Sequence, residues 1–195
     1  MIFVVFDTRA GRQEEFVTFW AKQYFYKNDD LYTQNIGKPL SYETIQKLFL
    51  WKNGGPLSGL KKKSVQENFA SRLSELTKLP RDCGAESFLN LFATGGAIWR
   101  IFFLHIWQPN KYPIYDQHVH RSMCFLKNGR MEEIGQNADG IIESYIRSYL
   151  PFYAEFPTMP VRSVDKALWM FGRFLKSPFR SLVSISDDAE LEKKG

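Results

Sequence analysis

The chain contains few cysteines and few histidines. Its 195 residues include two cysteines, Cys83 and Cys124, and three histidines. Two cysteines cannot form the disulfide framework of a small secreted domain, and they cannot supply the four thiolates of an iron–sulfur cluster or of a four-cysteine zinc site. We therefore predict no cofactor and no metal site, and we interpret both cysteines as small buried apolar side chains.

Long apolar runs are also missing. No stretch of the sequence approaches the ~20 consecutive apolar residues of a membrane-spanning helix, so no membrane span is expected. The apolar run 2–6 lacks a preceding basic segment and is followed at once by Asp7 and Arg9, which is unlike a signal peptide. We interpret it as a short β-strand and expect a cytoplasmic protein.

Charge of one sign exceeds the other only moderately. Lys and Arg number 26 and Asp and Glu number 21, which gives a formal net charge of +5. This excess permits a nucleic-acid partner without requiring one. Segment 184–195 is polar and acidic, so the rest of the chain is more basic than the total suggests.

Apolar residues recur with helical spacing between glycine and proline breaks, which predicts a mainly α fold with a short N-terminal strand. Segment 97–107 has almost no polar side and is expected to be a buried central helix. Ser41 is expected to cap the helix that follows it. The other helices are expected over 14–26, 41–51, 64–76, 86–92, 116–125, 131–150 with a break or start near Gly140, and 163–175. Three regions are expected: helices with the strand over 1–80, a core over 81–183 and an acidic tail over 184–195.

A glycine turn precedes the buried helix. Gly95 and Gly96 permit a tight turn and a close approach of the backbone to a ligand. The amides of Gly96, Ala97 and Ile98 then lie at a helix N-terminus, which favours an anion such as phosphate, and Arg100 follows one turn later. The same pattern also fits two helices that simply pack against each other.

Asp116 follows an extended, proline-containing segment and opens the next expected helix. A carboxylate there caps the helix and is favoured by the helix dipole. Beside a groove, it can also stabilise a cationic sugar while a base departs, or activate water. Capping alone explains the residue equally well.

Residues 88–121 resemble the helix-hairpin-helix DNA glycosylase superfamily, which includes endonuclease III and 8-oxoguanine DNA glycosylase. The similarity is sharpest over 116–121 (Asp-Gln-His-Val-His-Arg), where the family has Asp, often His, and Arg. Segment 112–114 resembles the approach to that Asp, and 164–174 resembles the late helix beside the hairpin. The whole chain is most similar to bacterial proteins described as 8-oxoguanine glycosylase-like.

The resemblance implies a DNA partner, a flipped base and a base-excision activity, with Asp116 as the catalytic residue. It places phosphate on the hairpin and the base between aromatic side chains. The run Lys61 to Lys63 is a further candidate for phosphate contact, or else a solvated helix start. The implied DNA-binding residues are Gly95, Gly96, Ala97, Arg100, Arg121, His118, Lys61, Lys62 and Lys63, and the implied base-pocket residues are Trp99 and Tyr115.

The sequence departs from the family at the position of the Schiff-base lysine. Ile98, Trp99 and Arg100 occupy the start of the buried helix, and an arginine cannot act as the amine nucleophile. The cysteines that bind an iron–sulfur cluster in some members are also absent. If active, the protein is therefore expected to be a monofunctional N-glycosyl hydrolase. The alternative is a catalytically inactive nucleic-acid-binding or protein-interaction module, for example in a bacterial stress or antiphage system.

The three histidines do not suggest a metal site. His118 and His120 are two residues apart, which on a helix directs them ~200° apart, so they cannot readily share one ion. His105 lies in the expected buried helix and is interpreted as a hydrogen-bonded core residue. His118 is expected to contact phosphate or to hold the loop near Asp116.

Overall fold

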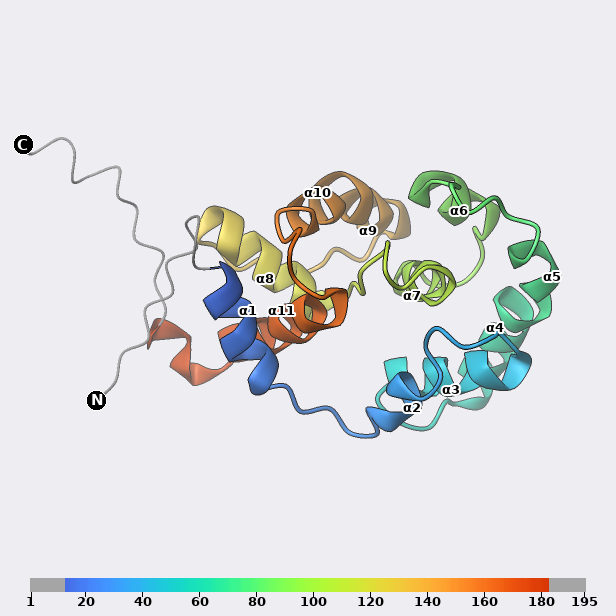
Figure 1. Cartoon of the computed structure of the whole chain (residues 1–195), viewed down its shortest axis with the longest axis horizontal. Helices are drawn as coiled ribbons and strands as arrows, with labels where there is room; N and C mark the ends of the chain where they lie inside the picture. The colour runs from blue at the N-terminus through green and yellow to red at the C-terminus, as the bar shows by residue number, and fades with distance from the viewer. Residues whose placement is uncertain (1–12, 183–195) are drawn as a thin grey trace, which may run out of the picture. The chain divides into compact units, whose positions relative to one another are not determined.

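The computed structural model describes residues 13–182, which form helices and connecting loops without a strand (Figure 1). The mainly α prediction is therefore correct for this part of the chain, whereas the expected strand at 2–6 and the acidic tail 184–195 lie outside it. The α-helices are α1 (Gln13–Lys22), α2 (Asp30–Thr33), α3 (Tyr42–Lys52), α4 (Gly59–Asn68), α5 (Leu73–Leu76), α6 (Ala85–Leu91), α7 (Ala97–Trp107), α8 (Gln117–Asn128), α9 (Ala138–Ser144), α10 (Leu150–Tyr153) and α11 (Val161–Leu175). Two 3-10 segments, η1 (Ala70–Arg72) and η3 (Pro178–Leu182), and a π-helical segment, η2 (Tyr145–Tyr149), join them.

The chain divides into two compact units, each built from segments that are far apart in sequence. The described part of the first unit comprises 13–24, 116–134 and 152–182, and the second unit comprises 25–115 and 135–151. The boundary predicted near residue 80 lies inside the second unit, and the predicted core region contributes segments to both units.

In the first unit, α11 packs against both α1 and α8 (Figure 1). Phe171 of α11 contacts Phe16 and Trp20 of α1, each with ring centroids 5.2 Å apart. On its other side, α11 approaches α8 so closely that a Cβ at Gly172 would lie 1.9 Å from the backbone oxygen of His118. Glycine therefore sets the spacing of these two helices.

In the second unit, α7 is the buried helix that its composition predicts, and it spans the expected residues. Phe102 and Phe103 are at most 1% exposed and contact aromatic rings of other helices. His105 is fully buried, with Nδ1 2.7 Å from the Tyr112 carbonyl and Nε2 2.8 Å from the Tyr32 hydroxyl. It is the hydrogen-bonded core histidine that the sequence suggests.

Local capping signals place several helix ends correctly, but the helices expected over 14–26, 64–76 and 131–150 differ in extent from the observed ones. The Ser41 hydroxyl accepts a hydrogen bond from the Thr44 amide at 3.1 Å, as expected. The helix expected from residue 64 begins at Gly59, because Ser58 caps it. The helix expected from residue 131 begins only at Ala138, where Asn137 caps it.

Candidate functional site

Asp116 is held at the N-terminus of α8 by two backbone amides. Its Oδ1 accepts hydrogen bonds from His118 N at 2.9 Å and Val119 N at 3.2 Å. The predicted N-cap is therefore confirmed, and the carboxylate lies at the positive end of the helix dipole. Asp116 is half-buried, so the cap does not seal it inside the unit.

His118 lies next to Asp116 and is also half-buried. Its ring meets Trp169 of α11 edge to face, with centroids 5.5 Å apart, and its Nδ1 is 3.1 Å from Arg121 Nη1. Burial lowers the pKa of His118; the charges of Arg121 and of two further cations act in the same direction, and Asp116 opposes them. The imidazole is therefore neutral at neutral pH and can accept a hydrogen bond from Arg121.

Arg121 of α8 is buried and connects this helix to α11 and to the segment that carries Glu133. It is 0% exposed and donates to both carboxylate oxygens of Glu133, at 2.7 and 2.8 Å, and to the Gly172 carbonyl at 2.9 Å. The Arg121 charge lowers the pKa of Glu133 chiefly through these hydrogen bonds. With this geometry Arg121 fastens α8 to α11 and to the segment that carries Glu133, and its role in DNA binding stays a prediction.

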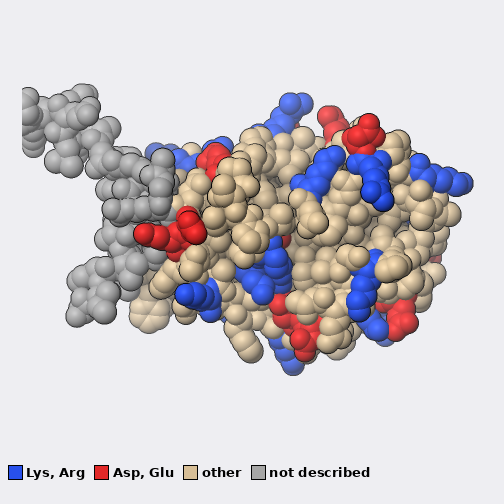
Figure 2. Space-filling view, viewed as in Figure 1, with Lys and Arg blue, Asp and Glu red and all other residues tan. Residues whose placement is uncertain are grey.

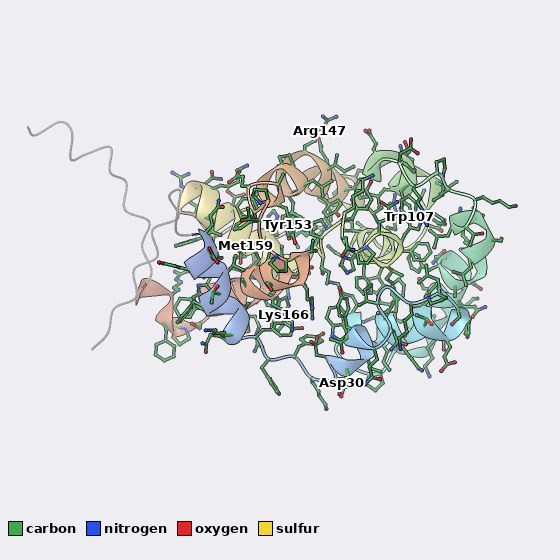
Figure 3. All side chains as sticks on the ribbon, in the orientation of Figure 1. Asp30, Trp107, Arg147, Tyr153, Met159 and Lys166 are labelled. Atoms are coloured by element: carbon green, nitrogen blue, oxygen red, sulfur yellow. The ribbon has the colours of Figure 1, made fainter. Side chains whose placement is uncertain are left out.

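One side of α11 carries three cations and a tryptophan, and a tyrosine from another segment lies against them. Arg162, Lys166, Trp169 and Arg173 follow one another at intervals of four, three and four residues, which places them on one helix face. Arg162 and Lys166 lie over the ring of Tyr24, at 5.1 and 4.9 Å, and Arg173 lies over Trp169 at 4.9 Å. We call these five residues the α11 row; Figure 3 labels Lys166.

The α11 row is continuous with the surroundings of Asp116. Tyr24 and Trp169 contact each other with ring centroids 5.5 Å apart, and Trp169 in turn contacts His118. Arg173 is exposed, and Tyr24, Lys166 and Trp169 are half-buried. The helical spacing of these residues is present in the sequence, but the same spacing also fits a helix face that packs against the rest of the protein.

The predicted glycine turn lies in the second unit, where it joins α6 and α7 into a helical hairpin. Gly95 has a φ of +89° and Gly96 is the N-cap residue of α7, so the glycine turn leads into a helix N-terminus as expected. Both glycines are exposed, whereas Ala97 is buried. The first amides of α7 lack partners within the helix, which is the geometry that favours an anion.

The other residues implied for the second unit differ in accessibility. Arg100 is 7% exposed and donates to the carbonyls of Phe92 at 2.9 Å and Leu89 at 2.6 Å, so it satisfies the end of α6. Tyr115 is 0% exposed, and its hydroxyl is 2.9 Å from the Ser144 hydroxyl. Trp99 is half-buried. These contacts give Arg100 and Tyr115 structural roles, while their roles toward DNA stay predictions.

The three lysines lie within α4 and are exposed. Lys61 donates to Asn53 Oδ1 at 2.7 Å and lies 6.0 Å from the Trp99 ring, while Lys63 pairs with Glu67 at 3.7 Å. Lys62 borders a hollow of about 600 Å³ between α3 and α4. In Figure 2, basic and acidic groups are interspersed on the visible face, which shows no uniform basic surface.

His120, unlike His118, contacts a cysteine. Its Nε2 is 3.5 Å from Cys124 Sγ one helical turn later, and both residues are buried. Burial and then the Glu132 charge raise the pKa of the Cys124 thiol to about 11. The thiol is therefore protonated at neutral pH and is a poor nucleophile.

Comparison with protein-family models, curated proteins and solved structures finds no match for the chain. Among the residues that the structure describes, no helix combines the length and the apolar character that crossing a membrane requires.

Proposed function

We propose that this protein binds DNA and hydrolyses the N-glycosidic bond of a flipped, modified or damaged base, with Asp116 as the catalytic carboxylate. The observation that carries the proposal is a half-buried carboxylate, fixed at a helix N-terminus, next to a continuous row of aromatic and cationic side chains. The resemblance of 116–121 to the helix-hairpin-helix glycosylases supports the same activity.

The α11 row suits a nucleic-acid strand. Arginine and lysine neutralise phosphates, and aromatic faces stack on bases that have left the duplex. Arg173 and Lys166 provide the charge, while Trp169 and Tyr24 provide the rings. In the second unit, the amides after Gly96 are a second candidate for phosphate binding.

In the proposed reaction, the bond between C1′ of the sugar and the base nitrogen breaks, and the base leaves with the bonding electrons. The carboxylate of Asp116 stabilises the positive charge that develops on the sugar. Water then adds its oxygen to C1′, and its proton neutralises the departing base. No covalent enzyme intermediate is required, in accordance with the absence of lysine at residues 98–100.

The test is a panel of duplexes that carry modified or damaged bases, incubated with the protein and then treated with alkali. We expect strand breaks at one class of modified base, and a loss of at least about 100-fold in rate for Asp116→Asn. Asparagine caps a helix as well as aspartate does, so this variant is expected to stay folded. The exposed Asp82→Asn is the matched control. Absence of breaks across the panel, or equal rates for Asp116→Asn and the wild type, would refute the catalytic proposal.

A catalytically inactive DNA-binding module is the second candidate, favoured by the use of Asp116 Oδ1 as a helix cap. It predicts salt-dependent binding without base release. If Arg173 contacts a phosphate, Arg173→Ala is expected to weaken binding to all DNA sequences. It should also reduce by about 1 the slope of the logarithm of the binding constant against the logarithm of the salt concentration. Lys22→Ala, at the end of α1 and outside the α11 row, is the control. Binding that does not change with salt would contradict both candidates.

A further inference from the structure

We infer that His120, Cys124 and Glu132 form a binding site for a divalent transition-metal ion of the zinc class. Their nitrogen, sulfur and oxygen atoms all lie within 4.8 Å of one another. The site belongs to the first unit, and the inference does not depend on the proposed hydrolysis. The spacing of His118 and His120 does not reveal this site, because the residue next to the His120 ring is Cys124.

The two buried ligands come from one face of α8. His120 and Cys124 are four residues apart, the spacing that brings side chains together on a helix. Their ligand atoms are 3.5 Å apart. A tetrahedral zinc site with bonds of ~2.05 Å to nitrogen and ~2.3 Å to sulfur separates these two atoms by about 3.6 Å. The observed separation therefore fits without rearrangement of the helix.

The third ligand comes from the segment that follows α8. Glu132 Oε2 is 4.0 Å from Cys124 Sγ, against the separation of about 3.6 Å that tetrahedral zinc requires between sulfur and oxygen. Glu132 is exposed, so its side chain can move by this small amount. Its neighbour Glu133 is anchored by the buried Arg121, which holds the backbone that presents Glu132.

The donor set selects the class of ion. Imidazole nitrogen and thiolate sulfur suit zinc and similar transition metals, whereas magnesium and calcium prefer oxygen ligands. Binding of the metal releases the proton of the Cys124 thiol to solvent. Three protein ligands leave one tetrahedral position for water.

The experiment is a titration of the purified, reduced full-length protein with Zn²⁺ in competition with a chromogenic chelator. We expect one zinc ion per chain, no competition from Mg²⁺, and a loss of more than about tenfold in affinity for Cys124→Ser and for Glu132→Gln. Cys83→Ser and Glu155→Gln are the matched controls, because neither residue belongs to the cluster. Circular dichroism reports whether each variant is folded.

Co²⁺ provides a readout that does not depend on a variant. A thiolate ligand gives a sulfur-to-cobalt charge-transfer absorption, and a tetrahedral site gives intense visible bands; we expect both in the wild type and in Cys83→Ser. Failure of the wild type to bind Zn²⁺, a cobalt complex without the charge-transfer band, or loss of binding in Cys83→Ser would each overturn the inference.

Discussion

Gly95 and Gly172 each occupy a position that other residues fit poorly, but for different physical reasons. Gly95, in the hairpin of the second unit, has a φ of +89°, and a Cβ there would lie 2.9 Å from the tip of the Phe69 ring. Gly172, in the interior of α11, has helical backbone, and a Cβ would lie 1.9 Å from the His118 carbonyl oxygen. The first glycine is required by a turn and the second by a helix–helix contact.

Gly95 lies at a surface that a ligand can reach, whereas Gly172 lies at a contact between two helices. The hairpin glycine is exposed, and its turn presents the N-terminus of α7. The α11 glycine is buried, and its carbonyl accepts a hydrogen bond from Arg121. Substitution at Gly95 should therefore affect both stability and the proposed DNA binding, whereas substitution at Gly172 should affect stability first.

Gly172→Ala is expected to have the largest effect on stability. The obstacle is backbone rather than the end of a flexible side chain, so α8 and α11 must separate, and we expect a loss of about 3 kcal/mol. Urea denaturation followed by circular dichroism measures it. Gly140→Ala in α9 is the control: its nearest neighbour would be 3.9 Å away, and a gain of up to about 1 kcal/mol is expected from helix propensity. Equal stability of Gly172→Ala and the wild type would contradict the close contact.

Arg121→Met is expected to rank second, with a loss of about 2–3 kcal/mol. The substitution removes the donor to the Gly172 carbonyl and the three hydrogen bonds to Glu133. Because Glu133 is largely exposed, water can solvate its carboxylate, which keeps the loss below that of a fully buried pair. The exposed Arg130→Met should change the free energy of unfolding by less than about 0.5 kcal/mol. If both variants have the same stability, Arg121 does not tie the helices together.

Gly95→Ala is expected to cost about 1–2 kcal/mol, because an alanine at positive φ is strained. The new methyl group would also lie 2.9 Å from the tip of the Phe69 ring, which is fully buried against Phe49 and Phe103, so a steric cost adds to the strain. In the same samples, fluorescence anisotropy with labelled DNA should show weaker binding, since the turn no longer presents the α7 amides in the same way. Gly96→Ser has open space around its Cβ and a hydroxyl that can cap α7, so stability and binding should be retained. If Gly95→Ala binds DNA as tightly as the wild type, the glycine turn does not contribute to DNA binding.

The smallest effect is expected at a second arginine–glutamate pair, in the unit that contains the hairpin. A hydrogen bond from Arg72 lowers the pKa of Glu75, and Arg72 also donates to the Leu91 carbonyl at the end of α6. The contribution of the Glu75 carboxylate is present above its ordinary pKa of 4.5 and is lost as the pH falls through its lower pKa in the folded state. Glu75→Gln should therefore be slightly less stable than the wild type at pH 7, and the difference should vanish in acid. A difference that persists at low pH would contradict the assignment to the ion pair.

Helices could be predicted where the information is local. The helix predicted over 97–107 is correct, because this segment is apolar on nearly every side and lies between a glycine turn and a proline. The Asp116 cap was also predicted correctly, because capping involves only residues within the next turn. The helix expected from residue 131 begins only at Ala138, and Glu133, in the segment before it, contacts Arg121 twelve residues earlier in the chain.

The candidate site was harder to predict, because a sequence shows that a residue is charged but not where the charge lies. Arg121 and Arg100 look like phosphate ligands, yet their guanidinium groups face carbonyls and a carboxylate of the protein. The α11 row and the His120–Cys124 pair both have helical spacing, but spacing alone does not distinguish a functional face from a packed one.

By itself, the sequence determined that the described part of the chain is mainly helical, that α7 lies between a glycine turn and a proline, and that Asp116 caps α8, because each of these depends on neighbours within a turn or two. The tertiary structure decided which arginines are buried, which helix face carries exposed cations and rings, and which side chain His120 contacts. These outcomes depend on the packing of segments that are distant in the chain, and apolar burial and hydrogen-bond satisfaction choose among arrangements that the local sequence leaves open.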